Sequence, residues 1–134
     1  MNTLNYLRSY LYNTKNDWNY ILPIDFYNNY YLTNKDYVLI DLRDEASYKK
    51  NHIKGSKNIF WLDILDEQNL KKLPKDKMIF LICYVGHTSS QVLTLLKLLG
   101  YNALSIKYGY GLSPVVGVPV AGWLNYGLPT ESSN

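Results

Sequence analysis

Residues 78–107 read MIFLICYVGHTSSQVLTLLKLLGYNALSIK, and this stretch decides the fold class. Two short, largely apolar runs, residues 78–83 and 103–107, lie at its ends, and the first is nearly continuous. Runs of this length are typical of strands that are buried on both faces, as in a parallel sheet. Between them, apolar side chains recur at helical spacing and predict a helix with one buried face, formed by Val92, Leu95, Leu96 and Leu99.

Both ends of this predicted helix carry recognisable signals. Thr88 and Gln91 have the spacing of a capping box, which places the helix start within the loop after Cys83. Gly100 suits the left-handed position that often follows a helix. The order strand, loop, helix, strand is one βαβ unit, and its crossover is right-handed by the general rule.

The rest of the chain extends this unit into an open α/β sheet. Residues 37–42, YVLIDL, form a third apolar run that predicts a buried strand, and helices are expected around residues 24–31 and 44–51. At 134 residues the chain is long enough for one domain. A short amphipathic helix, packed on this domain or on a partner, is expected near the N-terminus from the spacing of Leu4, Leu7 and Leu11.

Composition and charge argue against several classes of function. The chain carries 14 basic and 11 acidic residues, and this net charge of +3 is a smaller excess than nucleic-acid or membrane-surface binding would require. No stretch has the length of a transmembrane helix, and the first twenty residues lack the apolar region of a signal peptide. We therefore expect a cytoplasmic protein without membrane insertion, unless an export signal has been removed. One cysteine and two histidines are a poor ligand set, so we expect no metal and no cofactor.

Cys83 is the only cysteine, and it stands at the carboxyl end of a predicted strand. Open α/β sheets place their sites at this edge, where loops turn into helices. Cys83 is either a core residue, because free cysteine is among the most buried residue types, or a reactive thiol. We favour the reactive thiol, because the backbone N–H groups of a short loop and the positive end of a helix stabilise a thiolate.

Three segments of the chain match one known pattern. In residues 83–89 a cysteine at a strand end is followed by a glycine three residues on, a hydroxyl residue and a helix. Residues 123–129, WLNYGLP, match Trp-x-x-x-Gly-x-Pro, and residues 41–59 match Asp-x-Arg, acidic-x-x-Tyr and His-Ile-x-Gly-Ala/Ser-x-Asn-Ile. Together these segments resemble the rhodanese-like sulfurtransferase family. The matching positions of the longest segment are Asp41, Arg43, Glu45, Tyr48, His52, Ile53, Gly55, Ser56, Asn58 and Ile59.

The resemblance implies both a fold and a chemistry. The family fold is a five-stranded parallel sheet flanked by helices, here over residues 20–134, with residues 1–19 as an N-terminal amphipathic extension. Cys83 would attack a small-molecule sulfane sulfur donor, hold the sulfur as a persulfide, and pass it to a thiol, a cyanide-like nucleophile or a protein acceptor. The resemblance places the bound sulfur among the backbone N–H groups of Tyr84, Val85, Gly86, His87, Thr88 and Ser89.

Asp41, Arg43 and His52 are expected to support the site rather than to react. Two opposite charges that follow a buried strand are expected to bind each other, because an isolated charge near the core is costly. His52 lies in a loop before Gly55 and has the character of a polar staple rather than of a base.

The sequence also departs from the family pattern. Many active members carry arginine directly after the cysteine and again five residues on, where this chain has Tyr84 and Thr88. Without a guanidinium in the loop, thiosulfate is expected to be an inefficient donor, although a protonated His87 would supply part of the charge. Ahead of Trp123 lies an apolar insert, residues 112–122, which could be a wall of the site, a partner surface or, as we favour, core packing.

Two other functions remain open at this point. A noncatalytic rhodanese-like binding or regulatory module is favoured by the missing arginines and opposed by the retained Cys83. A cysteine phosphatase or arsenate reductase shares the fold and the loop, but it needs an arginine six residues after the cysteine to clamp an oxyanion. Ser89 occupies that position and makes this second alternative remote.

Overall fold

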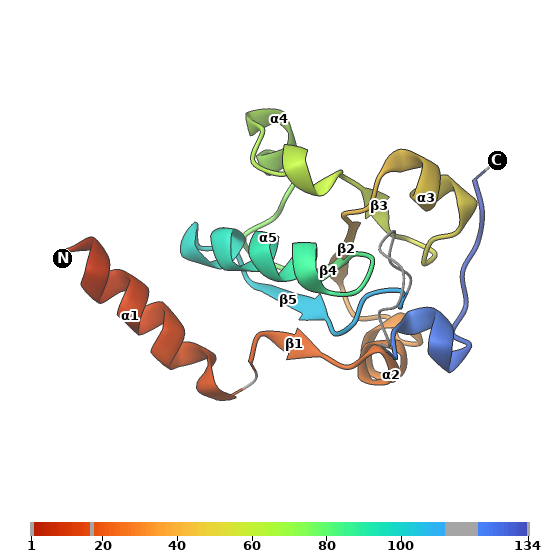
Figure 1. The fold of residues 1–134 in the computed structure, drawn as a ribbon, viewed down its shortest axis with the longest axis horizontal. Helices are drawn as coiled ribbons and strands as arrows, with labels where there is room; N and C mark the ends of the chain where they lie inside the picture. Colours follow the sequence, from red (N-terminus) through yellow and green to blue (C-terminus); the bar gives the residue numbers. More distant parts are fainter. Residues whose placement is uncertain (1, 17, 112–120, 134) are drawn as a thin grey trace.

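The computed structural model describes residues 2–16, 18–111 and 121–133 and contains a five-stranded parallel sheet with helices on both faces (Figure 1). The strand order is β1-β5-β4-β2-β3, with β4 in the centre. This confirms the α/β class and the parallel sheet expected from the sequence. The strands are β1 Tyr20–Ile21, β2 Tyr37–Asp41, β3 Lys57–Asn58, β4 Met78–Ile82 and β5 Ala103–Ile106.

Helices and single turns connect the strands. The longest is α5, which begins directly after the loop that follows β4 and leads into β5. The helix expected around residues 24–31 is present as α2, which continues into the π-helical turn η2. The elements are α1 Thr3–Asn13, η1 Thr14–Asn16, α2 Pro23–Phe26, η2 Tyr27–Tyr31, α3 Glu45–Lys50, η3 Trp61–Asp63, α4 Glu67–Leu70, α5 His87–Leu98 and η4 Trp123–Tyr126.

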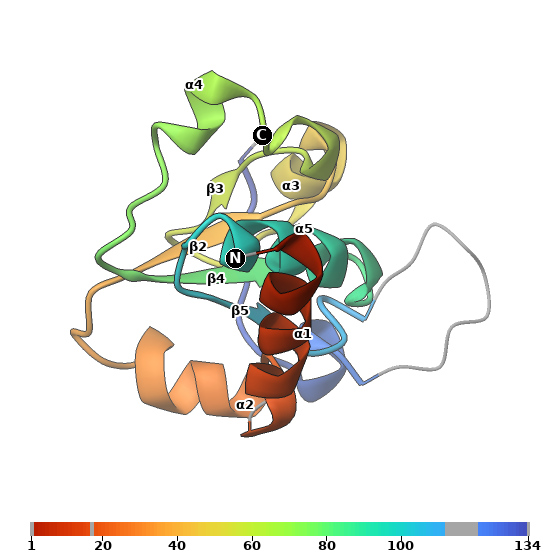
Figure 2. The ribbon, with the colours of Figure 1, turned by 90° about the vertical axis from the view of Figure 1, so that its left-hand side faces the viewer.

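The two faces of the sheet bury separate clusters of apolar side chains. Because side chains alternate along a strand, Ile79 and Leu81 face one cluster while Phe80 and Ile82 face the other. The first cluster lies under α5 and the segment of η3 and α4, and the second lies against α2 and η4, which occupy the other side of the sheet in Figure 2. Both faces of β4 are therefore covered, which explains its continuous apolar sequence.

The buried face of α5 differs from the predicted one. Val92 and Leu96 are buried as expected, but Leu95 and Leu99 are 44% and 48% exposed and Leu93 is buried. The buried residues of α5 are Ser89, Val92, Leu93 and Leu96. Residues at this spacing lie on one face of a helix, and the centre of the face lies between Val92 and Leu93. Since apolar residues occupy most of the helix circumference, their spacing predicts the helix but leaves its rotation undefined.

The N-terminal helix α1 contacts the domain through tyrosine hydroxyls rather than through leucines. Tyr6 donates to the carbonyl of Leu98, and Tyr10 donates to Thr94 Oγ1 at 3.3 Å, so α1 lies beside α5. The three leucines of the predicted apolar face are all exposed, and none of the residues of α1 is buried. Of the two expected contacts for these leucines, packing on the domain is not seen, and packing on a partner stays a prediction. None of the described helices combines the length and the apolar character needed to span a bilayer.

Candidate active site

Cys83 lies at the carboxyl edge of the sheet, directly after β4. The register pairs Asp41 of β2 with Ile82 of β4, so the segments that follow these two strands leave the sheet at the same level. Gly86 has φ of 99°, a left-handed conformation that lets the chain turn from strand to helix within four residues. The turn brings the start of α5 back over the strand end, where Cys83 is 1% exposed.

Two backbone N–H groups converge on the sulfur. Gly86 N donates to Cys83 Sγ at 3.1 Å, and Ser89 N donates to it at 3.3 Å. The amides of His87 and Thr88 belong to the first helical turn and have no acceptor inside the helix. Of the six loop residues expected to surround a bound sulfur, Gly86 and Ser89 thus bond Sγ directly, while His87 and Thr88 retain amides that a further sulfur atom could use.

The predicted capping box at the start of α5 is wrong. The N-cap is Gly86, which has no side chain, and α5 begins at His87. The N–H of Ser89 at the third helical position, which a capping side chain would normally bind, donates to Cys83 Sγ instead. The sulfur therefore takes the place of the cap. Thr88 Oγ1 is left buried without a hydrogen-bond partner in the described part of the chain.

A pocket of about 340 Å³ opens beside the sulfur. Its walls include two aromatic residues that sequence reasoning did not select, Phe60 and Trp61. They follow the His-Ile-x-Gly-Ser-x-Asn-Ile segment directly, and Trp61 N donates to the carbonyl of Leu42 at 3.0 Å, which holds them at the edge where β2 ends. Proximity in sequence to that signature was the one available signal. The pocket is lined by Phe60, Trp61, Cys83, Tyr84, Val85, His87 and Thr88.

This pocket contains no arginine. Neither Arg8 nor Arg43 lines it, and exposed His87 is its only side chain that can carry a positive charge. Ser89, six residues after the cysteine, is fully buried and its hydroxyl lies 2.7 Å from that of Ser105. A phosphatase-type oxyanion clamp is therefore missing from this position. In the described ranges, no three His, Cys, Asp or Glu side chains gather as metal ligands.

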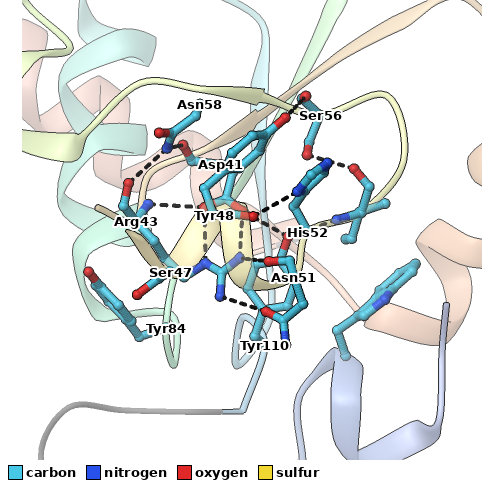
Figure 3. A network of polar contacts seen from close by, with 12 residues as sticks. Asp41, Arg43, Ser47, Tyr48, Asn51, His52, Ser56, Asn58, Tyr84 and Tyr110 are labelled. Carbon is cyan, nitrogen blue, oxygen red and sulfur yellow. Dashed lines mark hydrogen bonds and ion pairs between the residues drawn. The ribbon is translucent and has the colours of Figure 1, made fainter. Parts of the chain in front are cut away.

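Asp41 and Arg43 form a buried ion pair behind the site (Figure 3). Arg43 Nη2 lies 2.9 Å from Asp41 Oδ2 and Nε lies 3.1 Å from Oδ1, a bidentate geometry in which both side chains are almost fully buried. Tyr110 donates its hydroxyl to Asp41 Oδ2 at 2.8 Å, and the guanidinium lies 3.7 Å from the centre of the Tyr110 ring. Burial, followed by the charge of Asp41, raises the pKa of Tyr110 far above its ordinary value.

The same pair fixes the loops around it. Arg43 Nη2 donates to the carbonyl of Asn51, and Arg43 Nη1 lies 3.3 Å from Asn51 Oδ1. Asn58 Nδ2 donates to the carbonyls of Asp41 and Arg43 at 3.0 and 2.8 Å. The Arg43 side chain thus joins the end of β2 to the segment around residue 51, and Asn58 bonds the backbone of Asp41 and Arg43. Neither Asp41 nor Arg43 lines the sulfur pocket.

His52 belongs to the same network of polar contacts (Figure 3) and does not line the sulfur pocket. Its ring stacks on Tyr48 with centroids 4.0 Å apart, and Nδ1 lies 2.7 Å from the carbonyl of Tyr48 (Figure 3). Its backbone exchanges two hydrogen bonds of 2.8 Å with Glu131, whose Oε1 lies 3.4 Å from Nε2. The residue therefore joins α3 to the C-terminal segment.

Tyr84 connects the cysteine loop to the start of α3, a contact that the sequence did not reveal. Its hydroxyl donates to Asp44 Oδ2 at 2.6 Å and accepts from Asp44 N at 3.1 Å. Asp44 also caps α3, because Oδ1 accepts from Ser47 N at 2.8 Å. The hydrogen bond from Tyr84, followed by that from Ser47, lowers the pKa of Asp44, whereas burial, followed by the bond to Asp44, raises the pKa of Tyr84.

A glycine turn after β5 supports the cysteine loop from the other side. Tyr110 N donates to the carbonyl of Cys83 at 3.0 Å, and Gly111 N donates to that of Tyr84 at 2.9 Å. Gly109 has φ of 54°, and a Cβ at this position would lie 2.2 Å from the carbonyl oxygen of Cys83, so only glycine fits. Most of the apolar insert expected at residues 112–122 lies outside the described residues.

Comparison with known proteins agrees with this geometry. A family model described as rhodanese-like domain matches residues 28–111, and the chain belongs to this family. Over 70 residues it is 40% identical to a tRNA sulfurtransferase from Pyrobaculum aerophilum, covering 52% of this chain but only 14% of that protein.

Solved structures show the same fold. A rhodanese-related protein from Thermoplasma volcanium matches with a TM-score of 0.66 and 24% identity, over 83% of this chain and 95% of its own. A rhodanese-like domain protein from Staphylococcus aureus matches with a TM-score of 0.63 and 22% identity, over 75% of this chain and 96% of its own. The α/β domain with a strand-end cysteine is therefore a rhodanese-like domain.

Proposed function

We propose that this protein is a sulfurtransferase or sulfur carrier in which Cys83 is the nucleophile. The observation that carries the proposal is the convergence of the Gly86 and Ser89 amides on Cys83 Sγ, at the start of α5 and beside a pocket. Hydrogen bonds and a helix N-terminus both favour the charged form of sulfur, and the thiolate is the reactive form. Similarity to a tRNA sulfurtransferase supports sulfur transfer as the class of activity.

The reaction takes place in two displacements at sulfur. The Cys83 thiolate attacks the outer sulfur of a donor R–S–SH, the S–S bond of the donor breaks, and RS⁻ leaves with the bonding electrons, giving Cys83–S–SH. An acceptor thiolate then attacks the terminal sulfur, and Cys83 Sγ leaves as the thiolate. Since Cys83 is the only cysteine, no second thiol in this chain can resolve the persulfide as a disulfide, and the acceptor comes from outside.

The pocket favours an organic persulfide over thiosulfate as donor. Phe60 and Trp61 offer apolar surface to an organic group, and no guanidinium is present to attract a dianion. Thr88 Oγ1 and the free first-turn amides are neutral donors that suit the single charge of a persulfide. Asp41, Arg43 and His52 are proposed to hold the surrounding loops and to take no part in the chemistry.

Intact-mass measurement tests the proposal. The protein is incubated with a low-molecular-weight organic persulfide, a polysulfide or thiosulfate, and its mass is recorded before and after reduction. We expect the mass of one added sulfur atom with the organic persulfide, its loss on reduction, and no addition in Cys83→Ala. A folded wild-type protein that gains no sulfur from any donor would contradict the catalytic proposal and favour a noncatalytic binding module.

A further inference from the structure

A buried serine hydroxyl contacts the sulfur of Cys83, and a second buried serine, from another element, contacts the first. Ser89, in the first turn of α5, has its Oγ 3.2 Å from Cys83 Sγ. Ser105, in β5, has its Oγ 2.7 Å from Ser89 Oγ. Both residues are 0% exposed, and Ser89 is the sole hydrogen-bond partner of the Ser105 hydroxyl in the described ranges.

The directions of the hydrogen bonds among Cys83, Ser89 and Ser105 differ between the Cys83 thiol and its thiolate. A hydroxyl has one hydrogen to donate and two lone pairs that accept. When Cys83 is protonated, its S–H donates to Ser89 Oγ, and Ser89 donates to the carbonyl of Gly86 at 3.2 Å. When Cys83 loses its proton, the sulfur only accepts, so Ser89 has to turn its O–H toward Sγ to keep the contact.

That rotation leaves no polar group without a partner. Gly86 O still accepts from Ser90 Oγ at 2.7 Å and from Ser90 N at 3.2 Å after Ser89 has turned away. Ser89 Oγ still has lone pairs that accept, and the Ser105 hydroxyl, 2.7 Å away, donates to it. Ser105 then donates to Ser89, and Ser89 donates to the sulfur. Because the two hydrogen bonds point in the same direction, the first polarises the Ser89 hydroxyl and strengthens the second.

We propose that Ser105 is a positioning residue that acts through Ser89 to stabilise the Cys83 thiolate. The two hydroxyls form a relay that delivers a third hydrogen bond to the sulfur, in addition to those from the Gly86 and Ser89 amides. In the proposed sulfur transfer, on which this part rests, the relay acts again when the acceptor attacks the terminal sulfur. The Sγ–S bond then breaks, its electron pair moves onto Sγ, and Ser89 donates to the leaving thiolate.

The pH dependence of Cys83 alkylation measures the relay directly. Cys83 is the only cysteine, so iodoacetamide reacts at one thiol, and its rate follows the thiolate fraction. In Ser89→Ala the midpoint of the rate profile is expected to rise by roughly one to two pH units, as for loss of a hydrogen bond to a charged group. In Ser105→Ala it is expected to rise by roughly half to one pH unit, because a neutral hydrogen bond is lost one step away.

The double variant distinguishes a relay from an independent effect. If Ser105 acts through Ser89, Ser105→Ala adds no shift in a Ser89→Ala background. The matched control is Ser56→Ala, which removes a buried hydroxyl that donates to the carbonyl of Ile53 and does not contact the sulfur. The midpoint of this variant should equal that of the wild type. Ser105→Thr keeps a hydroxyl at position 105, so its midpoint should also equal that of the wild type.

Two results would overturn the relay. One is a wild-type midpoint in Ser105→Ala, which removes a single oxygen and should remain folded by circular dichroism. The other is an equal shift from Ser105→Ala in the presence and absence of the Ser89 hydroxyl. Alkylation requires no sulfur donor, so failure of Cys83 to gain sulfur in the mass experiment would overturn the proposed function without affecting the measured midpoints.

Discussion

Arg43→Ala should destabilise the protein strongly while leaving the sulfur pocket in place. Arg43 is 3% exposed and Asp41 is fully buried, so truncation leaves a buried carboxylate without its cation. Breaking a buried pair in this way costs about 3–5 kcal/mol. With an unfolding entropy of about 2.1 cal/mol/K per residue, a chain of 134 residues should melt roughly 10–18 °C lower.

Thermal unfolding followed by circular dichroism, with sulfur loading measured below the transition, is the assay for this prediction. The control is the double variant Asp41→Asn with Arg43→Met, which removes both charges and should recover part of the lost stability because no charge is left unpaired. Loading per folded molecule should remain close to wild type in Arg43→Ala. An unchanged melting temperature together with lost sulfur loading would refute the supporting role and assign Arg43 to the chemistry.

Further predictions concern Thr88 and Asp44. Thr88→Arg should raise kcat/KM for thiosulfate at low salt, relative to Thr88→Ala. The gain should shrink at physiological ionic strength, where salt screens the added charge over about 8 Å. Equal kcat/KM values for the two variants at low salt would refute the missing-arginine explanation. Thr88→Val removes a buried hydroxyl without a partner, so it should stabilise the fold by about 1 kcal/mol in thermal unfolding while slowing sulfur loading. Asp44→Asn keeps a capping oxygen but loses the charge. Because the folded pKa of Asp44 is lowered from 3.8, its contribution is present above that value and is lost as pH falls through the folded pKa, so the stability gap between wild type and variant should close in acid.

The sequence predicts those strands that are covered on both faces, because such strands consist mostly of apolar residues. β2, β4 and β5 are largely apolar on both faces, because helices cover both sides of the sheet, and each was found from its own residues. β1 and β3 have two residues each, too few for any periodicity, and they exist because their backbones pair with β5 and β2. The number of five strands therefore followed from the family resemblance and not from pattern.

The candidate site divides in the same way. The position of Cys83 at a strand end and the turn of its loop are local properties, and a strand run followed by a glycine was enough to locate them. Trp61 and Ser105 reach the sulfur region from segments about 20 residues away on either side, through strand pairing that composition does not encode. The wrong capping box has the same origin, because the acceptor for the Ser89 amide is a sulfur that folding brings to the helix start.

The distribution of charge around Cys83 explains why a neutral site would select its donor. The guanidinium of Arg43, near the carboxyl edge, is buried, binds Asp41 and Asn51, and does not line the pocket, so it is not placed to bind an anion there. Among the described residues, the sulfur forms hydrogen bonds only with neutral groups, namely two backbone amides and the Ser89 hydroxyl. Transfer from thiosulfate releases sulfite as a dianion, and His87, when protonated, is the one side chain lining this pocket that would offer it a positive charge. Transfer from an organic persulfide releases a thiolate with one charge, whose organic group can remain against Phe60 and Trp61. We therefore infer that the preference arises at the leaving group, and that it should appear in the rate of sulfur loading at saturating donor as well as in donor affinity.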